Sequence, residues 1–284
     1  MLTIILGPTA VGKTQLSLEM AKSQGAHIVS ADAFQVYQGM DIGTAKPSLQ
    51  DREDVPHYLI DILPPSHQYS VSDFIHHVSG IVTESSQKEI PLIICGGTAF
   101  YLNAFLYGFE FEPDSSSPDI ANALYQDLES QGLSVLVERL MVLDPECADY
   151  MDIQNPRRVV RALTIFETTG QKPSQVRIRH PRTDVQLIGL EMDRAQLINR
   201  IHHRVDIMLA SGWIEEVHQL LAAGYSQISP GFQAIGYREI TSYLQGHLDY
   251  GAMVELIKTK TRQFSKRQMT WYRKFLNVEW RRVS

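Results

Sequence analysis

Residues 1–14, MLTIILGPTAVGKT, decide the fold. The apolar run 2–6 is typical of a parallel strand that is covered on both faces. Residues 7–14 have the spacing G-x-x-x-x-G-K-[ST] of a phosphate-binding loop, and residues 14–25, TQLSLEMAKSQG, predict a helix that ends at Gly25. A buried strand before this motif and a helix after it are the context that the motif requires.

The loop gives a first set of candidate binding residues. Its glycines allow a ligand to approach the backbone, and the N–H groups at the start of the helix favour an anion. Lys13 can reach the outer phosphates, and the Thr14 hydroxyl can ligate Mg²⁺, the expected cofactor. We expect phosphate or substrate binding by Gly7, Pro8, Thr9, Ala10, Val11, Gly12, Lys13 and Thr14.

Further apolar runs begin at His27, Ile90 and Val185, and helical patterns separate them. This alternation predicts an α/β fold: a P-loop NTPase-like parallel sheet flanked by helices, with an inserted all-helical module. Between Pro113 and about Pro181 the pattern changes: a polar linker, PDSSSPD, is followed by helical segments with no strand between them. We therefore predict a catalytic core of residues 1–112 and 184–284 with a basic C-terminal helix, and a helical insertion of residues 113–183.

Composition and charge restrict the functional class. The chain has 284 residues, 44% of them hydrophobic, and no uninterrupted apolar run long enough to span a membrane. Its start reads directly into a strand without a basic leader, and two cysteines are too few for a disulfide framework, so we expect a cytoplasmic protein and, by default, a monomer. The net charge is −6, yet residues 156–182 and 258–284 are strongly basic. These segments are either solvated helix faces or a footprint for a polyanion.

Two further positions follow predicted strands. Asp32 lies at the end of the second strand, where open α/β sheets bind ligands, and its position alone leaves a general base, a Mg²⁺ ligand and a turn cap open. Gly96 and Gly97 precede Thr98 and mark either a close approach of a ligand or a plain turn. The strand before them lacks the terminal aspartate usual in ATPases, which Asp61 could replace.

The C-terminal segment 258–275 interleaves cations and aromatic residues. Helical spacing predicts that its aromatic side chains pack mostly in the core and that its cations form a face that follows phosphates. The aromatic residues are Phe264, Trp271, Tyr272 and Phe275, and the stripe of cations is Lys258, Arg262 and Lys266.

Nine motifs occur in order over nearly the whole chain: GPTAVGKT, ADAFQVY, DIGTAKP, PHYLIDI, GGTAFY, NPRRVVRAL, GW-x-EEV, QAIGYRE and KRQMTW. With them the chain resembles the tRNA dimethylallyltransferases, also called tRNA isopentenyltransferases. The resemblance implies transfer of a dimethylallyl group from dimethylallyl diphosphate to N6 of adenosine 37 of tRNA, 3′ of the anticodon, with release of diphosphate. It also implies that the insertion grips the anticodon stem-loop.

The resemblance assigns roles to single residues. Asp32 would be the general base, with Thr98 and Lys13 completing the catalytic set, and Arg238 would join the loop in binding substrate. Gln35 would read an edge of the flipped base. Ala33 and Phe100 depart from the Ser and Leu usual in the family. The implied tRNA contacts are Asp32, Ala33, Phe34, Gln35, Thr98, Arg157, Arg158, Val159, Val160, Arg161, Gln233, Lys266 and Arg267.

Three other functions share parts of this pattern. An adenylate isopentenyltransferase would prenylate free AMP, ADP or ATP with the same loop and Asp32, but it has little use for the arginine-rich stretch NPRRVVRAL. A P-loop kinase acting on a small molecule would use Lys13 on the γ-phosphate of ATP. A non-catalytic RNA-binding switch would bind nucleotide only to regulate its affinity for RNA.

Overall fold

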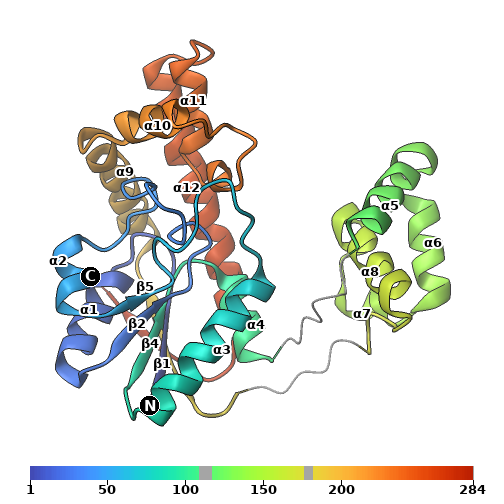
Figure 1. Ribbon diagram of the computed structural model, residues 1–284, viewed down its shortest axis with the longest axis horizontal. Coiled ribbons are helices and arrows are strands. Elements are labelled where there is room, and N and C mark those ends of the chain that lie inside the picture. The colour runs from blue at the N-terminus through green and yellow to red at the C-terminus, as the bar shows by residue number, and fades with distance from the viewer. Residues whose placement is uncertain (109–116, 176–181, 284) are drawn as a thin grey trace. The chain divides into compact units, whose positions relative to one another are not determined.

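The computed structural model describes residues 1–108, 117–175 and 182–283 (Figure 1). The chain divides into two compact units: unit 1 is Met1–Ala104 with Thr183–Ser284, and unit 2 is Phe105–Arg182. The predicted start of the insertion, Pro113, lies outside the described residues, as do Arg177 and Arg179 of the first basic segment.

A six-stranded parallel sheet in the order β3-β2-β4-β1-β5-β6 forms the centre of unit 1. The predicted α/β class is therefore confirmed. In β1, Ile4 pairs with Ile94 of β4 on one side and with Leu187 of β5 on the other. The strands are β1 Leu2–Leu6, β2 His27–Ser30, β3 His57–Tyr58, β4 Leu92–Cys95, β5 Val185–Glu191 and β6 Val278–Arg282.

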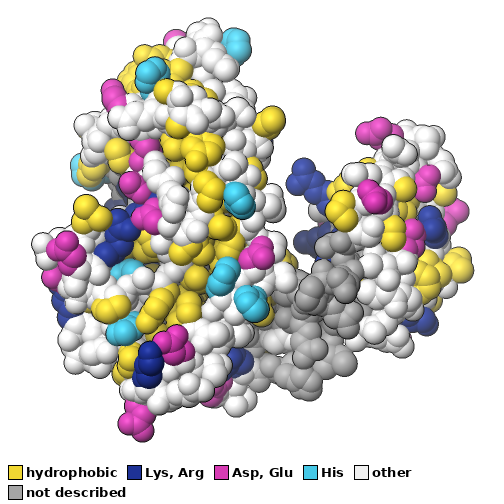
Figure 2. Space-filling view, in the orientation of Figure 1, with side chains coloured by type: hydrophobic (Ala, Val, Ile, Leu, Met, Phe, Trp, Pro, Cys, Tyr) yellow, Lys and Arg dark blue, Asp and Glu magenta, His cyan; other side chains and the backbone are white. Residues whose placement is uncertain are grey.

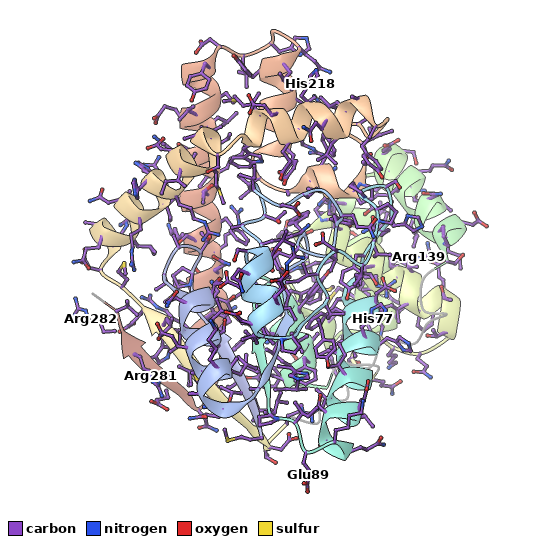
Figure 3. All side chains as sticks on the ribbon, turned by 60° about the vertical axis from the view of Figure 1, so that its left-hand side comes forward. His77, Glu89, Arg139, His218, Arg281 and Arg282 are labelled. Atoms are coloured by element: carbon purple, nitrogen blue, oxygen red, sulfur yellow. The ribbon has the colours of Figure 1, made fainter. Side chains whose placement is uncertain are left out.

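Sequence reasoning missed the two edge strands. β3 has only two residues, and β6 reads VEWRR, without the apolar run of a strand covered on both faces. Exposed charges on an edge strand discourage pairing with another chain. Figure 3 shows Arg281 and Arg282 at this edge of unit 1.

Helices flank the sheet, and α1 packs against β1, β2 and β4. In Figure 1, α10 and α11 lie at the end of unit 1 far from the N-terminus, beyond the carboxyl ends of the strands. The helices of unit 1 are α1 Lys13–Gln24, α2 Leu49–Asp54, α3 Val71–Gln87, α4 Ala99–Leu106, whose last two residues belong to unit 2, α9 Arg194–Ala210, α10 Trp213–Ala222, the 3₁₀ turn η1 Pro230–Gln233, α11 Tyr237–Leu244 and α12 Tyr250–Tyr272.

The strand register brings three loops to one edge of the sheet. Cys95 at the end of β4 lies opposite Ile5 of β1 on one side and Ser30 of β2 on the other. Because all three strands run parallel, the segments that follow them, 7–12, 31–35 and 96–98, start side by side. The predicted phosphate loop, Asp32 and Thr98 are thereby brought together.

Unit 2 is helical in its described part, with α5 Pro118–Gln131, α6 Leu133–Leu143, α7 Cys147–Tyr150 and α8 Pro156–Thr169. Its core gathers apolar side chains of these helices, among them Leu124, Leu140 and Leu163. The Asn155 side chain caps the start of α8 by accepting from the Arg157 N–H at 3.1 Å, and Gly170, in a left-handed conformation, caps its end.

One buried carboxylate holds the end of this unit together. Asp144 is 1% exposed and accepts hydrogen bonds from the Ser174 N–H at 2.7 Å, the Ser174 hydroxyl at 2.8 Å and the Cys147 thiol at 3.2 Å. Burial opposes the charge, but these donors and the charge of Lys172 hold the pKa of Asp144 below its usual value.

We expect Asp144→Ala to lower the free energy of unfolding of unit 2 by about 2 kcal/mol, because the Ser174 donors lose their acceptor. The carboxylate stabilises the fold only while it is charged, and its pKa is lower in the folded state. The difference from the wild type is therefore present above pH 4 or so, the unfolded value, and is lost as the pH falls through the folded pKa.

Urea titration of the full chain, read by pulsed hydrogen exchange of unit 2 peptides at several pH values, measures this difference. Glu129→Ala, at an exposed site on α5, is the matched control. Equal losses in the two variants, or a loss at Asp144 that acid leaves unchanged, would contradict the assignment.

Candidate active site at the carboxyl edge of the sheet

The phosphate-type loop connects β1 to α1, and its lysine lies over the loop itself. Lys13 Nζ donates to the carbonyl oxygens of Gly7 at 2.8 Å and Pro8 at 2.9 Å. Burial lowers the pKa of Lys13 to about 8, although the nearby Cys95 and Asp32 favour its charged form. The ammonium is thus held beside the loop, where an anionic ligand can replace the two carbonyl groups as its partner.

The ends of β2 and β4 touch through their backbones. Ala31 donates to the Cys95 carbonyl at 2.9 Å, and Thr98 donates to the Ala31 carbonyl at 3.0 Å. A Cβ on Gly96 would lie 2.2 Å from the Ala31 carbonyl oxygen, so only glycine fits. The close approach suggested for Gly96 is therefore made by the chain's own backbone.

Asp32 lies directly after this contact and is half-buried. Its Oδ1 accepts from the Phe34 N–H at 2.9 Å, so the carboxylate caps the turn as one of the sequence alternatives had it. Burial raises the pKa of Asp32 above its usual value, while the Phe34 N–H and Lys13 oppose this shift. Thr98 Oγ1 accepts from the Ala33 N–H at 2.9 Å and so joins the same turn to β4.

Two hollows meet at Asp32. We call the first the loop pocket; it measures about 90 Å³, and Lys13, Thr14, Asp32 and Cys95 are among its lining residues. The second, the aromatic pocket, measures about 460 Å³. Its lining includes Asp32, Thr98 and five aromatic residues, Phe34, Phe100, Trp213, Phe264 and Trp271.

α9 and α12 supply residues that sequence reasoning missed. Arg204 of α9 lines both pockets, and burial lowers the pKa of its guanidinium while the charge of Asp32 opposes the shift. Gln268 of α12 is 2% exposed; its Oε1 accepts from the Thr9 N–H at 2.8 Å, and its Nε2 donates to the Gly97 carbonyl at 2.7 Å. Arg204 lies outside the motifs that the sequence analysis quoted, whereas Gln268 lies within KRQMTW and was given no role there.

The core prediction for the C-terminal aromatic residues holds for Tyr272 and Phe275, which are buried. It is wrong for Phe264 and Trp271, which line the aromatic pocket. The Trp271 ring meets that of Phe100 edge to face, with the ring centroids 6.2 Å apart. Helical spacing could not separate a core face from a pocket face because the two adjoin on α12.

The predicted tRNA-contact residues of unit 1 fall into different environments. Ala33, Phe34, Gln233 and Arg267 line the aromatic pocket. Gln35 lines the loop pocket instead, and its amide is engaged within the chain. Its Oε1 accepts from the Ser30 hydroxyl at 2.8 Å, and its Nε2 donates to the carbonyl groups of residues 44 and 45 at 3.2 Å each. In this structure the Gln35 amide therefore supports the chain rather than facing the aromatic pocket.

Two other predicted residues lie away from these pockets. Lys266 is exposed and borders a different hollow with Pro8, Arg262 and Arg273. Arg238 is exposed on α11 and is not among the described residues that line the loop pocket or the aromatic pocket.

Ion pairs within the chain neutralise several expected binding charges. Lys258 pairs with Asp206 at 2.7 Å, so the predicted stripe of cations on α12 is already partly neutralised. Asp61, the suggested substitute for an ATPase aspartate, pairs with Lys46 and Arg52.

Unit 2 carries its own basic surface. Arg157, Arg158 and Arg161 are exposed on α8, whereas the side chains of Val159 and Val160 are buried in the core of the unit. Figure 2 shows Lys and Arg side chains grouped along one edge of unit 2. On this helix the arginine side chains, and not those of the two valines, are therefore accessible to a partner.

The loop pocket has donors that suit one kind of metal ion. Among the described residues, no three His, Cys, Asp or Glu side chains gather as a metal site. The Thr14 hydroxyl and the Asp32 carboxylate line the same pocket, and Mg²⁺ commonly takes one or two protein oxygens together with phosphate oxygens and water. The residues present therefore fit a Mg²⁺ ion bound with a phosphate ligand.

We expect Arg204→Met to weaken the binding of inorganic pyrophosphate between about ten- and a hundred-fold, because a charge-assisted contact in a confined pocket is lost. Arg200→Met, at an exposed site one turn earlier on α9, is the matched control. Isothermal titration calorimetry with both variants measures the difference. Equal affinities for wild type and Arg204→Met would place Arg204 outside the anion site.

Known proteins resemble this chain over nearly its full length. The family model for IPP transferase matches residues 35–275. The tRNA dimethylallyltransferase of Acetivibrio thermocellus is 40% identical over 282 residues, which cover 98% of this chain and 90% of the relative. The corresponding enzyme of Bacillus subtilis is 40% identical over 281 residues, with 98% and 89% covered.

Solved structures agree. A tRNA isopentenylpyrophosphate transferase from Bacillus halodurans has a TM-score of 0.74 at 37% identity, covering 99% of this chain and 89% of that one. A eukaryotic dimethylallyltransferase acting on tRNA has a TM-score of 0.86 at 30% identity, covering 99% and 73%. In the part of this chain that the structure describes, no helix is long and apolar enough to cross a membrane. With this sheet, this pair of pockets and these relatives, the chain belongs to the IPP transferase family.

Proposed function

We propose that the protein transfers a dimethylallyl group from dimethylallyl diphosphate to N6 of adenosine 37 of tRNA. The observation that carries this proposal is the position of Asp32, which lines both the loop pocket and the aromatic pocket. A diphosphate in the first pocket and a purine in the second would meet at this carboxylate. This shared position supports the role as base that the sequence resemblance implied for Asp32.

The loop pocket suits a diphosphate that departs. As the C–O bond of dimethylallyl diphosphate breaks, its electron pair leaves with the diphosphate and an allylic cation develops. Lys13 and Arg204 line this pocket with the N-terminal end of α1, and they stabilise the growing negative charge. Mg²⁺ held by Thr14 would supply further charge neutralisation when bound.

Asp32 suits proton removal from the attacking amine. The N6 lone pair is delocalised into the adenine ring, so the amine is a weak nucleophile and needs a base as the C–N bond forms. Burial raises the pKa of Asp32 above its usual value, which makes the carboxylate a stronger base than one in water. The proton passes to Asp32, and the product is the N6-dimethylallyl adenosine with free diphosphate.

A macromolecular substrate accounts for the remaining features. The target adenosine must leave its stack to enter the aromatic pocket, whose lining residues Phe34, Phe264 and Trp271 suit a base or a prenyl chain. The exposed arginines of α8 suit the phosphates of an anticodon stem-loop. The monomeric state and the cytoplasmic location expected from the sequence stay predictions.

We expect the protein, incubated with Mg²⁺, dimethylallyl diphosphate and unmodified tRNA, to add five carbons to adenosine. Asp32→Asn is expected to lower kcat by at least about a hundred-fold with tRNA affinity nearly unchanged, because only the acceptor of the proton is lost. Mass analysis of the nucleosides over time measures the added mass and the turnover, with parallel tubes that contain AMP or ATP in place of tRNA. Filter binding measures the tRNA affinity of the variant.

A mass gain only on the free nucleotide would reassign the substrate. Normal turnover in Asp32→Asn would remove Asp32 as the base, and no gain in any tube with folded protein would contradict the proposed reaction.

We expect replacement of Arg157, Arg158 and Arg161 by Ala to weaken tRNA binding and to reduce its salt dependence. Each lost phosphate contact should lower the slope of log affinity against log salt by about 0.7 to 0.9. Filter binding of tRNA over a series of salt concentrations measures the slope. Lys88→Ala, at an exposed site in unit 1, is the control, and an unchanged slope in the triple variant would make α8 a solvated face.

A further inference from the structure

A carboxylate outside the two pockets holds one of their walls. Glu216 on α10 accepts hydrogen bonds from three successive backbone N–H groups: those of Asp41 and Ile42 at 2.7 Å each and that of Gly43 at 3.2 Å. The Tyr237 hydroxyl donates to the same carboxylate at 2.7 Å. Burial and the charge of Glu216 raise the pKa of Tyr237 well above its usual value, so this hydroxyl stays a donor.

The segment held in this way, the 40–46 loop, forms part of both pockets. Gly43, Thr44 and Ala45 line the aromatic pocket, and Thr44 and Ala45 also line the loop pocket. Three donors aimed at one carboxylate fix a stretch of backbone that has no strand or helix of its own. Glu216 therefore sets the position of a wall that two substrates would share.

Close packing fixes the same stretch from its other side. A Cβ on Gly43 would lie 2.1 Å from Nε1 of Trp213 and 2.6 Å from Cε2 of Tyr237. The loop therefore lies directly on these two buried rings. Exposed His218 marks the outer side of α10 in Figure 3, and Glu216, two residues earlier, faces the loop.

Hydrogen bonds continue from this loop to the proposed base. The carbonyl groups of Thr44 and Ala45 accept from Gln35 Nε2, and the Ser30 hydroxyl donates to Gln35 Oε1. The backbone N–H groups of Phe34 and Gln35 both favour the charged form of Asp32. The path therefore runs from Glu216 through the 40–46 loop and Gln35 to the turn that carries Asp32.

We propose that Glu216 is a positioning residue for the transfer reaction: by binding the 40–46 loop, it holds Gln35 and the Asp32 turn in the geometry that the reaction needs. This inference rests on the proposed role of Asp32 as the base. It gives a function to the GW-x-EEV, DIGTAKP and QAIGYRE motifs, whose residues meet at this carboxylate.

Steady-state kinetics with tRNA and dimethylallyl diphosphate test the proposal. We expect Glu216→Ala to lower kcat at least ten-fold while the affinity for inorganic pyrophosphate stays within about two-fold, because Lys13 and Arg204, the charged groups that would bind this anion, are not among the described hydrogen-bond partners of Glu216. Glu216→Gln keeps an oxygen that can accept from Asp41 and Ile42, so it should retain more activity than Glu216→Ala. Glu215→Ala, at the exposed neighbouring glutamate, is the matched control and should behave as wild type.

A double-mutant cycle separates positioning from general loss of stability. If Glu216 acts through Gln35, the double variant Glu216→Gln/Gln35→Met should lose less kcat, relative to the wild type, than the product of the fold-losses of the two single variants. Additive effects, or a folded Glu216→Ala with normal kcat, would overturn the proposal. If Glu216→Ala does not fold, Tyr237→Phe and Gly43→Ala perturb the same contact, and normal kcat in both would overturn it. An inactive wild type would instead refute the proposed reaction itself.

Discussion

At the carboxyl ends of β2 and β4, Gly96 lies so close to Ala31 that a side chain on residue 96 would come within 2.2 Å of the Ala31 carbonyl oxygen. This contact has consequences beyond the sheet. The Thr98 N–H bonds to Ala31, the Thr98 hydroxyl accepts from the Ala33 N–H, and Asp32 lies between these two attachments. The proposed base is therefore carried by backbone whose place beside the phosphate loop is set by strand pairing.

Charge balance explains why the loop pocket is ready for an anion. Two cations, Lys13 and Arg204, and one carboxylate, Asp32, line a hollow of about 90 Å³. Burial lowers the pKa of Lys13 and of Arg204 and raises the pKa of Asp32, so it favours the neutral form of each group. The nearby opposite charges oppose these shifts. One carboxylate cannot balance two cations, so a diphosphate would complete the set. Such a pocket attracts an anion by its charge, and the desolvation of the charged side chains has already taken place during folding.

The sequence predicted those parts of the site that local backbone geometry defines. The phosphate loop follows from glycine spacing between a strand and a helix, and Asp32 follows from its place after a buried strand. Arg204, Gln268, Phe264 and Trp271 come from α9 and α12, far along the chain. Their roles depend on how these helices pack over the sheet edge, and helical periodicity reports only which residues share a face. The edge strand β6 was missed because its charged sequence lacks the pattern of a buried strand.

The aromatic pocket bears on the choice between transfer and hydrolysis. An allylic cation reacts with the nearest nucleophile, and in an open site that nucleophile would be water. Phe34, Phe264 and Trp271 line this pocket, and aromatic rings can attract a cation through their π-electrons while they offer water few hydrogen-bond partners. An adenine stacked among these rings would also occupy the space through which water could reach the reacting carbon. Selectivity for transfer would then come from the order of events: the cation forms only where the flipped base has already displaced the solvent.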